Sequence, residues 1–70
     1  MTEIRANTTG SIWKILVAVG DMIVPGQEVA ILESMKMEIP IEAEVDGRVT
    51  HILVHEGESV RQGQVLMVAL

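Results

Sequence analysis

Short aliphatic runs, separated by turns that contain glycine, form the hydrophobic pattern along the chain. Runs of this length that are rich in valine and isoleucine predict β-strands. The predicted strands are residues 4–6, 11–17, 28–32, 38–43, 48–54 and 65–69, with short extended pieces near Ile23 and Val60. No stretch repeats its apolar positions at a helical period. The pattern therefore predicts a small all-β sandwich or flattened barrel.

The clearest alternation of apolar and polar positions runs over residues 38–44, where Ile39, Ile41 and Ala43 are separated by glutamates and by Pro40. Such alternation indicates a strand with one buried and one solvated face. Because proline has no N–H group to donate to a ladder, this strand lies at a sheet edge or turns Pro40 outward.

Two turns are predicted from local sequence. The segment Val24-Pro25-Gly26-Gln27 fits a type II turn, because proline fixes φ at the second position and glycine accepts a positive φ at the third. The pair Asp46-Gly47 is a signal for a tight turn.

The chain also repeats itself. Residues 10–21 align with residues 47–58 at an offset of 37, and the triplet Ile-Leu-Val recurs unchanged at 15–17 and 52–54. The repeat predicts two interlocked copies of one strand unit, related by a pseudo-twofold axis. The symmetry in turn predicts that the middle of the chain lies at one end of the body and that both termini lie at the opposite end.

The segment Met35-Lys36-Met37, at the middle of the chain, has no copy in the repeat. A lysine on a rigid hairpin tip suits the covalent attachment of a cofactor that must travel between proteins. An exposed lysine amine is protonated and unreactive at neutral pH, so attachment requires a separate enzyme that activates the cofactor. Met35 and Met37 would give that enzyme flexible thioethers to recognise.

The pattern alone allows a second interpretation, in which Met35 and Met37 are core residues and Lys36 is a solvated turn lysine. The duplication around one unrepeated tip favours the attachment site. The only other lysine, Lys14, aligns with His51 in a predicted strand and is interpreted as a solvated strand residue.

Composition limits the chain to one small domain, residues 1–70. There is no cysteine, whereas valine and isoleucine number ten and eight, and Trp13 is the only aromatic residue. The interior must therefore be built from branched aliphatic side chains. The apolar runs are too short to span a membrane, and the first residues lack the features of a signal peptide, so a cytoplasmic location is expected. A net charge of −5 with scattered cations disfavours nucleic acids and membrane surfaces as partners.

Other candidate chemistry is weak. His51 and His55 have a spacing that would suit a metal on a helix, but their segment is predicted to be a strand. The glutamates Glu33, Glu38, Glu42 and Glu44 have no accompanying nucleophile or base. They are interpreted as a solvated face, and neither a catalytic nor a metal site is predicted.

The segment Glu33-Ser34-Met35-Lys36-Met37 closely resembles the Glu-Ala-Met-Lys-Met signature of the biotinyl domains of biotin-dependent carboxylases. The resemblance extends over residues 6–70 and is closest to the short, free-standing biotin/lipoyl attachment proteins. It implies a barrel-sandwich hybrid fold, a flattened barrel of two four-stranded sheets. It further implies that Lys36 on the hairpin carries biotin, that Met35 and Met37 are recognised by the ligase, and that Glu33 and Ser34 complete the hairpin motif.

Three departures from the family pattern are present. Ser34 replaces the usual alanine, and Asn7-Thr8 stands where the family often has Pro-Met. The spacing from Gly20 to Gly26 equals that from Gly57 to Gly63. There is consequently no room for the protruding thumb of some acetyl-CoA carboxylase carriers.

The resemblance implies a non-catalytic carrier, monomeric on its own, of the kind found in acetyl-CoA carboxylase and fatty acid biosynthesis. Its partners would be biotin protein ligase, biotin carboxylase and a carboxyltransferase, between which a carboxyl group passes. The alternatives are a lipoyl carrier for acyl transfer, a dual acceptor of biotin and lipoate, or an unmodified structural domain. Specificity for acetyl-CoA, propionyl-CoA, pyruvate or urea lies in the partner enzyme.

Overall fold

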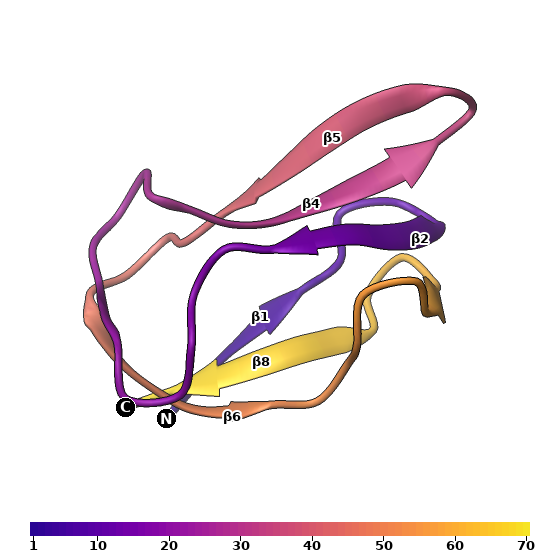
Figure 1. Ribbon diagram of the computed structural model, residues 1–70. Helices are drawn as coiled ribbons and strands as arrows, with labels where there is room; N and C mark the ends of the chain where they lie inside the picture. The colour runs from indigo at the N-terminus through magenta and orange to yellow at the C-terminus, as the bar shows by residue number, and fades with distance from the viewer.

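The computed structural model describes residues 1–70, which form eight β-strands and no helix (Figure 1). The strands make two four-stranded antiparallel sheets, with the orders β1-β8-β6-β3 and β5-β4-β2-β7. All predicted strands and both short pieces are present, with ends shifted by no more than two residues. The strands are β1 Thr2–Arg5, β2 Gly10–Ile15, β3 Met22–Ile23, β4 Glu28–Ser34, β5 Met37–Glu42, β6 Gly47–Ile52, β7 Ser59–Val60 and β8 Val65–Ala69.

The two sheets are copies of one another, as the sequence repeat predicts. Each strand of the first half corresponds to a strand in the other sheet: β2 to β6, β3 to β7, and β4 to β8. The remaining pair, β1 and β5, extends the repeat beyond the aligned segments, with Ile4 matching Ile41 at the same offset. The matched strands β2 and β6 also share a shift in pairing register, between Ile12 and Lys14 in β2 and between Val49 and His51 in β6.

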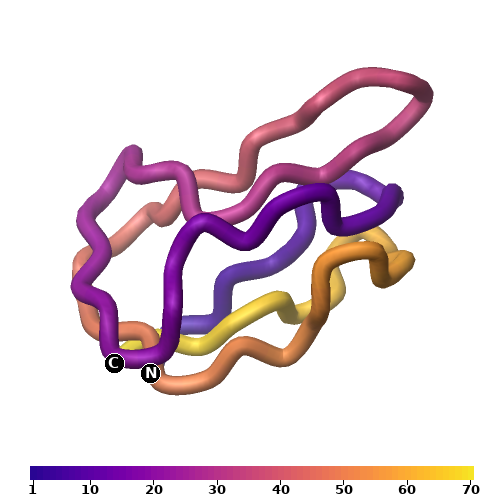
Figure 2. The backbone as a smooth tube through the Cα atoms, in the orientation of Figure 1, coloured from indigo at the N-terminus to yellow at the C-terminus, as the bar shows by residue number.

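The halves are joined by matched backbone hydrogen bonds. Gly20, in the turn after β2, donates to Val49 of β6 at 2.8 Å. Gly57, in the turn after β6, donates to Ile12 of β2 at 2.7 Å. The chain therefore crosses between the sheets twice in the same manner, which gives the interlocked path visible in Figure 2.

Of the two turns predicted from the sequence, one is present and the other is not. The type II turn over Val24-Pro25-Gly26-Gln27 is confirmed, since Gly26 has φ 87° and Gln27 donates to the Val24 carbonyl at 3.1 Å. The tight turn at Asp46-Gly47 is wrong, because the chain bends at Glu44 and Val45 and Gly47 is already the first residue of β6.

Gly47 is required for a different reason. A Cβ atom there would lie 2.6 Å from the backbone carbonyl oxygen of Leu70. Gly10, its counterpart in the first half, has the same constraint, with a Cβ 2.5 Å from the Glu33 carbonyl oxygen. Both glycines thus let two strands approach closely at the start of β2 and β6.

The core fills the space between the two sheets and consists only of aliphatic side chains and one methionine. No polar side chain is buried, and Trp13 is exposed. Such packing must supply the stability that cysteine-containing domains of this size obtain from disulfides. The buried cluster comprises Ile4, Ala6, Ile12, Val17, Ile23, Val29, Ala30, Leu32, Ile41, Ala43, Val49, Val54, Val60, Leu66, Met67 and Ala69.

The body is elongated, with extents of 31 × 20 × 18 Å. The β4–β5 hairpin projects from one end, whereas both termini lie at the other end, where Thr2 pairs with Ala69 (Figure 1). This confirms the arrangement predicted from the repeat. β5 is an edge strand, which accommodates Pro40 as expected. No helix capable of crossing a membrane is found.

The assignment of buried residues leads to a prediction about stability. Leu66 is fully buried, whereas Leu53, which donates its backbone N–H to the Leu66 carbonyl, is 53% exposed. We expect Leu66→Ala to lower the free energy of unfolding by about 2–5 kcal/mol, because it removes buried methyl groups and leaves a cavity. The total free energy of unfolding of a chain of this size is only about 4–10 kcal/mol. Leu53→Ala should lower the free energy of unfolding by less than about 1 kcal/mol. Urea denaturation followed by circular dichroism checks both, and equal losses would contradict the assigned core.

Candidate functional site

The β4–β5 hairpin ends in a two-residue turn. Ser34 pairs with Met37, and the two residues between them, Met35 and Lys36, have φ angles of 51° and 64°. Positive φ at both central positions defines a type I′ turn, whose twist matches that of the flanking strands. These are the only two non-glycine residues with positive φ in the chain. The tip is therefore held in one conformation by the hairpin register, against the steric preference of its own residues.

Lys36 is the exposed apex of this turn. Its amine takes part in no ion pair, since the single ion pair of the structure joins Arg5 and Glu3. Met35 and Met37 on either side are 88% and 58% exposed. The interpretation of these methionines as core residues is thus wrong. A covalently attached acyl group requires an accessible amine with no competing partner, so Lys36 fits such a group.

The outer face of the hairpin is acidic. Glu33 of β4 lies directly opposite Glu38 of β5, and Glu28 lies opposite Glu42. All four side chains are exposed, and none has a cationic partner. Like charges in direct cross-strand pairs are mildly destabilising. Glu44, the remaining glutamate of the predicted set, is exposed as well, so the interpretation of Glu33, Glu38, Glu42 and Glu44 as solvated is confirmed.

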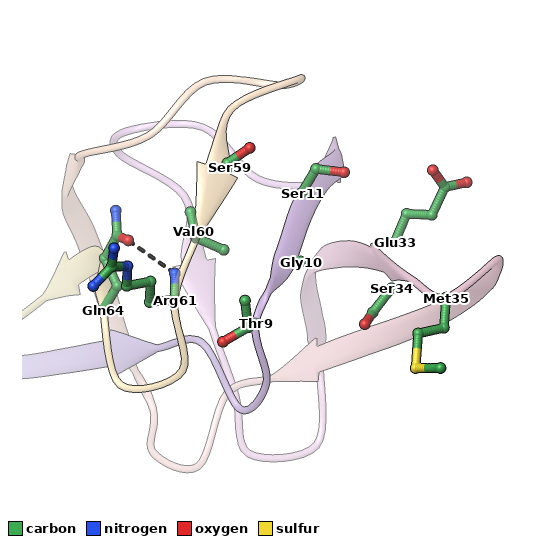
Figure 3. A pocket seen from close by; sticks show the side chains of 10 residues that line it. All are labelled: Thr9, Gly10, Ser11, Glu33, Ser34, Met35, Ser59, Val60, Arg61 and Gln64. Atoms are coloured by element: carbon green, nitrogen blue, oxygen red, sulfur yellow. Dashed lines mark hydrogen bonds between the residues drawn. The ribbon is translucent and has the colours of Figure 1, made fainter.

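An open cleft of about 570 Å³ lies beside the hairpin (Figure 3). Three serines contribute to its lining: Ser34 from the end of β4, Ser11 from β2 and Ser59 from β7. This cleft is not evident from the sequence, because its residues come from separate segments that only the sheet order brings together. Its lining is Thr9, Gly10, Ser11, Glu33, Ser34, Met35, Ser59, Val60, Arg61 and Gln64.

The remaining candidates of the sequence lie away from the tip. Lys14 is exposed on β2, as expected, and its Nζ lies 5.6 Å from the centre of the Trp13 ring. His51 is in β6, where its Nδ1 is 3.0 Å from the Thr50 hydroxyl, and His55 lies beyond the end of that strand. No group of three histidine, cysteine, aspartate or glutamate side chains is arranged to hold a metal ion.

Comparison with known proteins identifies the family. The sequence profile described as "Biotin-requiring enzyme", of the biotin/lipoyl type, matches residues 2–69. The chain belongs to this family. It is 55% identical over 58 residues to the biotin/lipoyl attachment protein of Bacillus subtilis, covering 83% of this chain and 80% of that protein. It is 38% identical over 66 residues to the biotinylated protein TB7.3 homolog of Mycobacterium leprae, covering 94% and 93%.

Longer relatives contain the same unit. The chain is 51% identical over 53 residues to the biotin carboxyl carrier protein of acetyl-CoA carboxylase of Nostoc, covering 76% of this chain and 29% of that protein. Among solved structures, the urea carboxylase of Kluyveromyces lactis matches with a TM-score of 0.92 and 35% identity, over 99% of this chain and 6% of that one. These matches confirm the barrel-sandwich hybrid fold, and they show that the unit also occurs as a small part of large enzymes.

The positive φ angles of the turn lead to a second prediction about stability. Asparagine adopts positive φ more readily than methionine does. We expect Met35→Asn to raise the free energy of unfolding by about 0.5–1 kcal/mol through relief of backbone strain. Met37→Asn, in the strand beside the turn, should not stabilise the protein, because asparagine is disfavoured in strands. Thermal and urea unfolding of both variants check this. A loss of stability in Met35→Asn would show that the turn is not strained.

Proposed function

We propose that this protein is a biotin carboxyl carrier, in which biotin is joined by an amide bond to Nζ of Lys36. The single observation that carries this proposal is the exposed, unpaired amine of Lys36 at the apex of the projecting hairpin, in a chain of the biotin/lipoyl family. Lys14, the only other lysine, lies along a strand with its amine over an indole ring, so it is less suited to present a long arm.

Bound biotin supplies a ureido nitrogen that can accept and release a carboxyl group, which is the chemistry that the chain itself lacks. The residues of the chain present and orient the group. Leu32 and Ile41, at 0% and 3% exposure, anchor the two hairpin strands in the core. The tip is thus held firmly, and the movement of the arm is confined to the lysine side chain and the cofactor. The proposal requires no catalytic group in this chain.

The partners follow from the cycle that such a carrier serves. A biotin protein ligase would form the amide bond and contact Met35 and Met37, with Glu33 and Ser34 completing the recognised hairpin. A biotin carboxylase, which uses ATP and bicarbonate, would load the carboxyl group, and a carboxyltransferase would pass it to an acceptor. We propose that the carrier is monomeric on its own and meets these partners in the cytoplasm. The Nostoc relative favours an acetyl-CoA carboxylase, and hence fatty acid synthesis.

A second candidate is lipoate on the same lysine. The relative in Bacillus subtilis is named a biotin/lipoyl attachment protein, which supports an acceptor of both groups. Lipoyl domains typically have an acidic residue before the lysine, whereas Met35 stands there in this chain. The methionine therefore favours biotin as the main cofactor.

Attachment at Lys36 is tested by removing its amine. We expect Lys36→Arg to abolish every cofactor adduct, because a guanidinium group cannot form the amide. Its free energy of unfolding should change by less than about 0.5 kcal/mol, since the side chain is exposed. Lys14→Arg, the matched control, should retain one biotinyl group. Intact mass and peptide mapping of each chain purified from its native host give the result. An adduct that survives in Lys36→Arg refutes the site.

The role of the methionine is tested by changing its chemistry. We expect Met35→Asp to reduce the specificity constant of biotin protein ligase about tenfold, which corresponds to the loss of one important interface contact. The same change should favour lipoylation. Met22→Asp is the control, because Met22 is 60% exposed but lies at the opposite end of the body. Ligase kinetics with purified proteins measure the effect, and an unchanged rate for Met35→Asp removes the recognition role.

A further inference from the structure

We propose that the hydroxyl-lined cleft beside the hairpin is a resting site for the cyclic urea ring of the biotin carried on Lys36 of the same chain. This inference rests on the proposed function, and it adds a second, non-covalent contact between the protein and its cofactor. The cleft begins at Ser34 and Met35, immediately before the attachment residue, and continues across β2 to β7 (Figure 3).

The internal duplication shows that the scaffold does not need these hydroxyl groups. Ser59, Ser11 and Glu33 form a row across three neighbouring strands at the lysine end. The positions that match them in the other half form an equivalent row at the end with the termini, and those positions are Met22, Arg48 and Leu70. The backbone pairing is the same in both rows, so the difference lies in the side chains alone. Serine occurs only in the row at the end that carries the lysine.

At the point nearest the hairpin the cleft is bounded by closely packed backbone. A Cβ atom on Gly10 would lie 3.3 Å from the Cβ of Ser34 and 2.5 Å from the Glu33 carbonyl oxygen, so β2 and β4 leave no free space between them here. The ring would therefore lie over the row of Ser59, Ser11 and Glu33, and not between the strands.

The lining groups match the hydrogen-bonding pattern of a cyclic urea. A urea has one carbonyl acceptor and two N–H donors, whereas a serine hydroxyl can both donate and accept. The hydroxyl groups of Ser11 and Ser59, which lie on the same face of the sheet as the Glu33 side chain, make no hydrogen bond within the protein (Figure 3). The Glu33 carboxylate has no cationic partner and can accept an N–H. The dithiolane ring of lipoate has no N–H donor and no carbonyl group. It therefore cannot form these hydrogen bonds with the lining residues.

The arm is long enough to return to the cleft. A lysine side chain joined to the valeryl chain of biotin contains eleven bonds, which span about 14 Å when extended. Glu33 lies three residues before Lys36, which is about 10 Å along the strand, and Ser11 lies one strand away, at about 5 Å. The straight path from Lys36 to Ser11 is then about 11 Å by the same spacings. The ring therefore reaches Ser11 with the arm partly bent.

The first experiment compares backbone amide chemical shifts of the unmodified and biotinylated protein by NMR, with intact mass confirming one biotinyl group on Lys36. Covalent modification alone shifts signals close to the turn, so Ser11 and Ser59, on other strands, are diagnostic. We expect both to shift, and we expect the matching positions Arg48 and Met22 to remain unchanged. A lipoylated sample should not reproduce the shifts at Ser11 and Ser59.

The second experiment measures how quickly streptavidin captures the attached biotin in stopped flow. A ring that rests in the cleft is captured more slowly than a free one. We expect the double variant Ser11→Ala/Ser59→Ala to be captured about two- to tenfold faster, the factor given by one hydrogen bond of ordinary net strength. Met22→Ala/Arg48→Ala, the matched control, should behave as the parent protein does. Circular dichroism verifies that both double variants are folded.

The outcomes separate the two proposals. A chain that bears no biotin on Lys36 overturns the proposed function and this inference together. A chain that is biotinylated on Lys36, but whose shifts stop at the hairpin and whose capture rate is unaffected by Ser11→Ala/Ser59→Ala, overturns the resting site alone.

Discussion

The two halves of this protein depend on each other for backbone hydrogen bonds. The turn after β2 is bonded to β6, and the turn after β6 is bonded to β2, by Gly20 to Val49 and Gly57 to Ile12. Neither half can pair the carbonyl groups of the buried residues Val49 and Ile12 in this way alone, and buried backbone groups that lack a partner are costly. The native structure therefore requires both copies, with the aliphatic core between them. The hairpin projects from this shared body (Figure 1).

The hairpin is where the two copies are joined, so the duplication itself creates the only unpaired feature of the fold. Because the linking residues have no counterpart, they can be specialised without disturbing either sheet. The conformation of the tip illustrates this freedom. Met35 and Lys36 adopt left-handed backbone angles that glycine or asparagine would take more easily. Their side chains are retained at a steric cost, which is expected where the identity of the residues matters for recognition.

Much of this structure could be predicted from the sequence, because local and repeated signals agree. Alternation defined the strands, proline and glycine defined the turn at residues 24–27, and the repeat placed Lys36 opposite the termini. The type of turn at the tip could not be predicted, since Met35 and Lys36 carry no turn signal and the register of β4 and β5 imposes it. The function of Gly47 was missed because its close neighbour, Leu70, is distant in sequence. The cleft was missed for the same reason.

The elongated shape has a consequence for a protein that must serve more than one partner. Both termini lie at one end of a body that is 31 Å long, and the lysine lies at the other end. Any tether joined at the termini would add the whole length of the body to the radius that the cofactor can sweep. A unit of the same fold forms a small part of the much longer urea carboxylase chain, where its length would likewise separate the hairpin tip from the points at which the unit is joined to the rest of the protein.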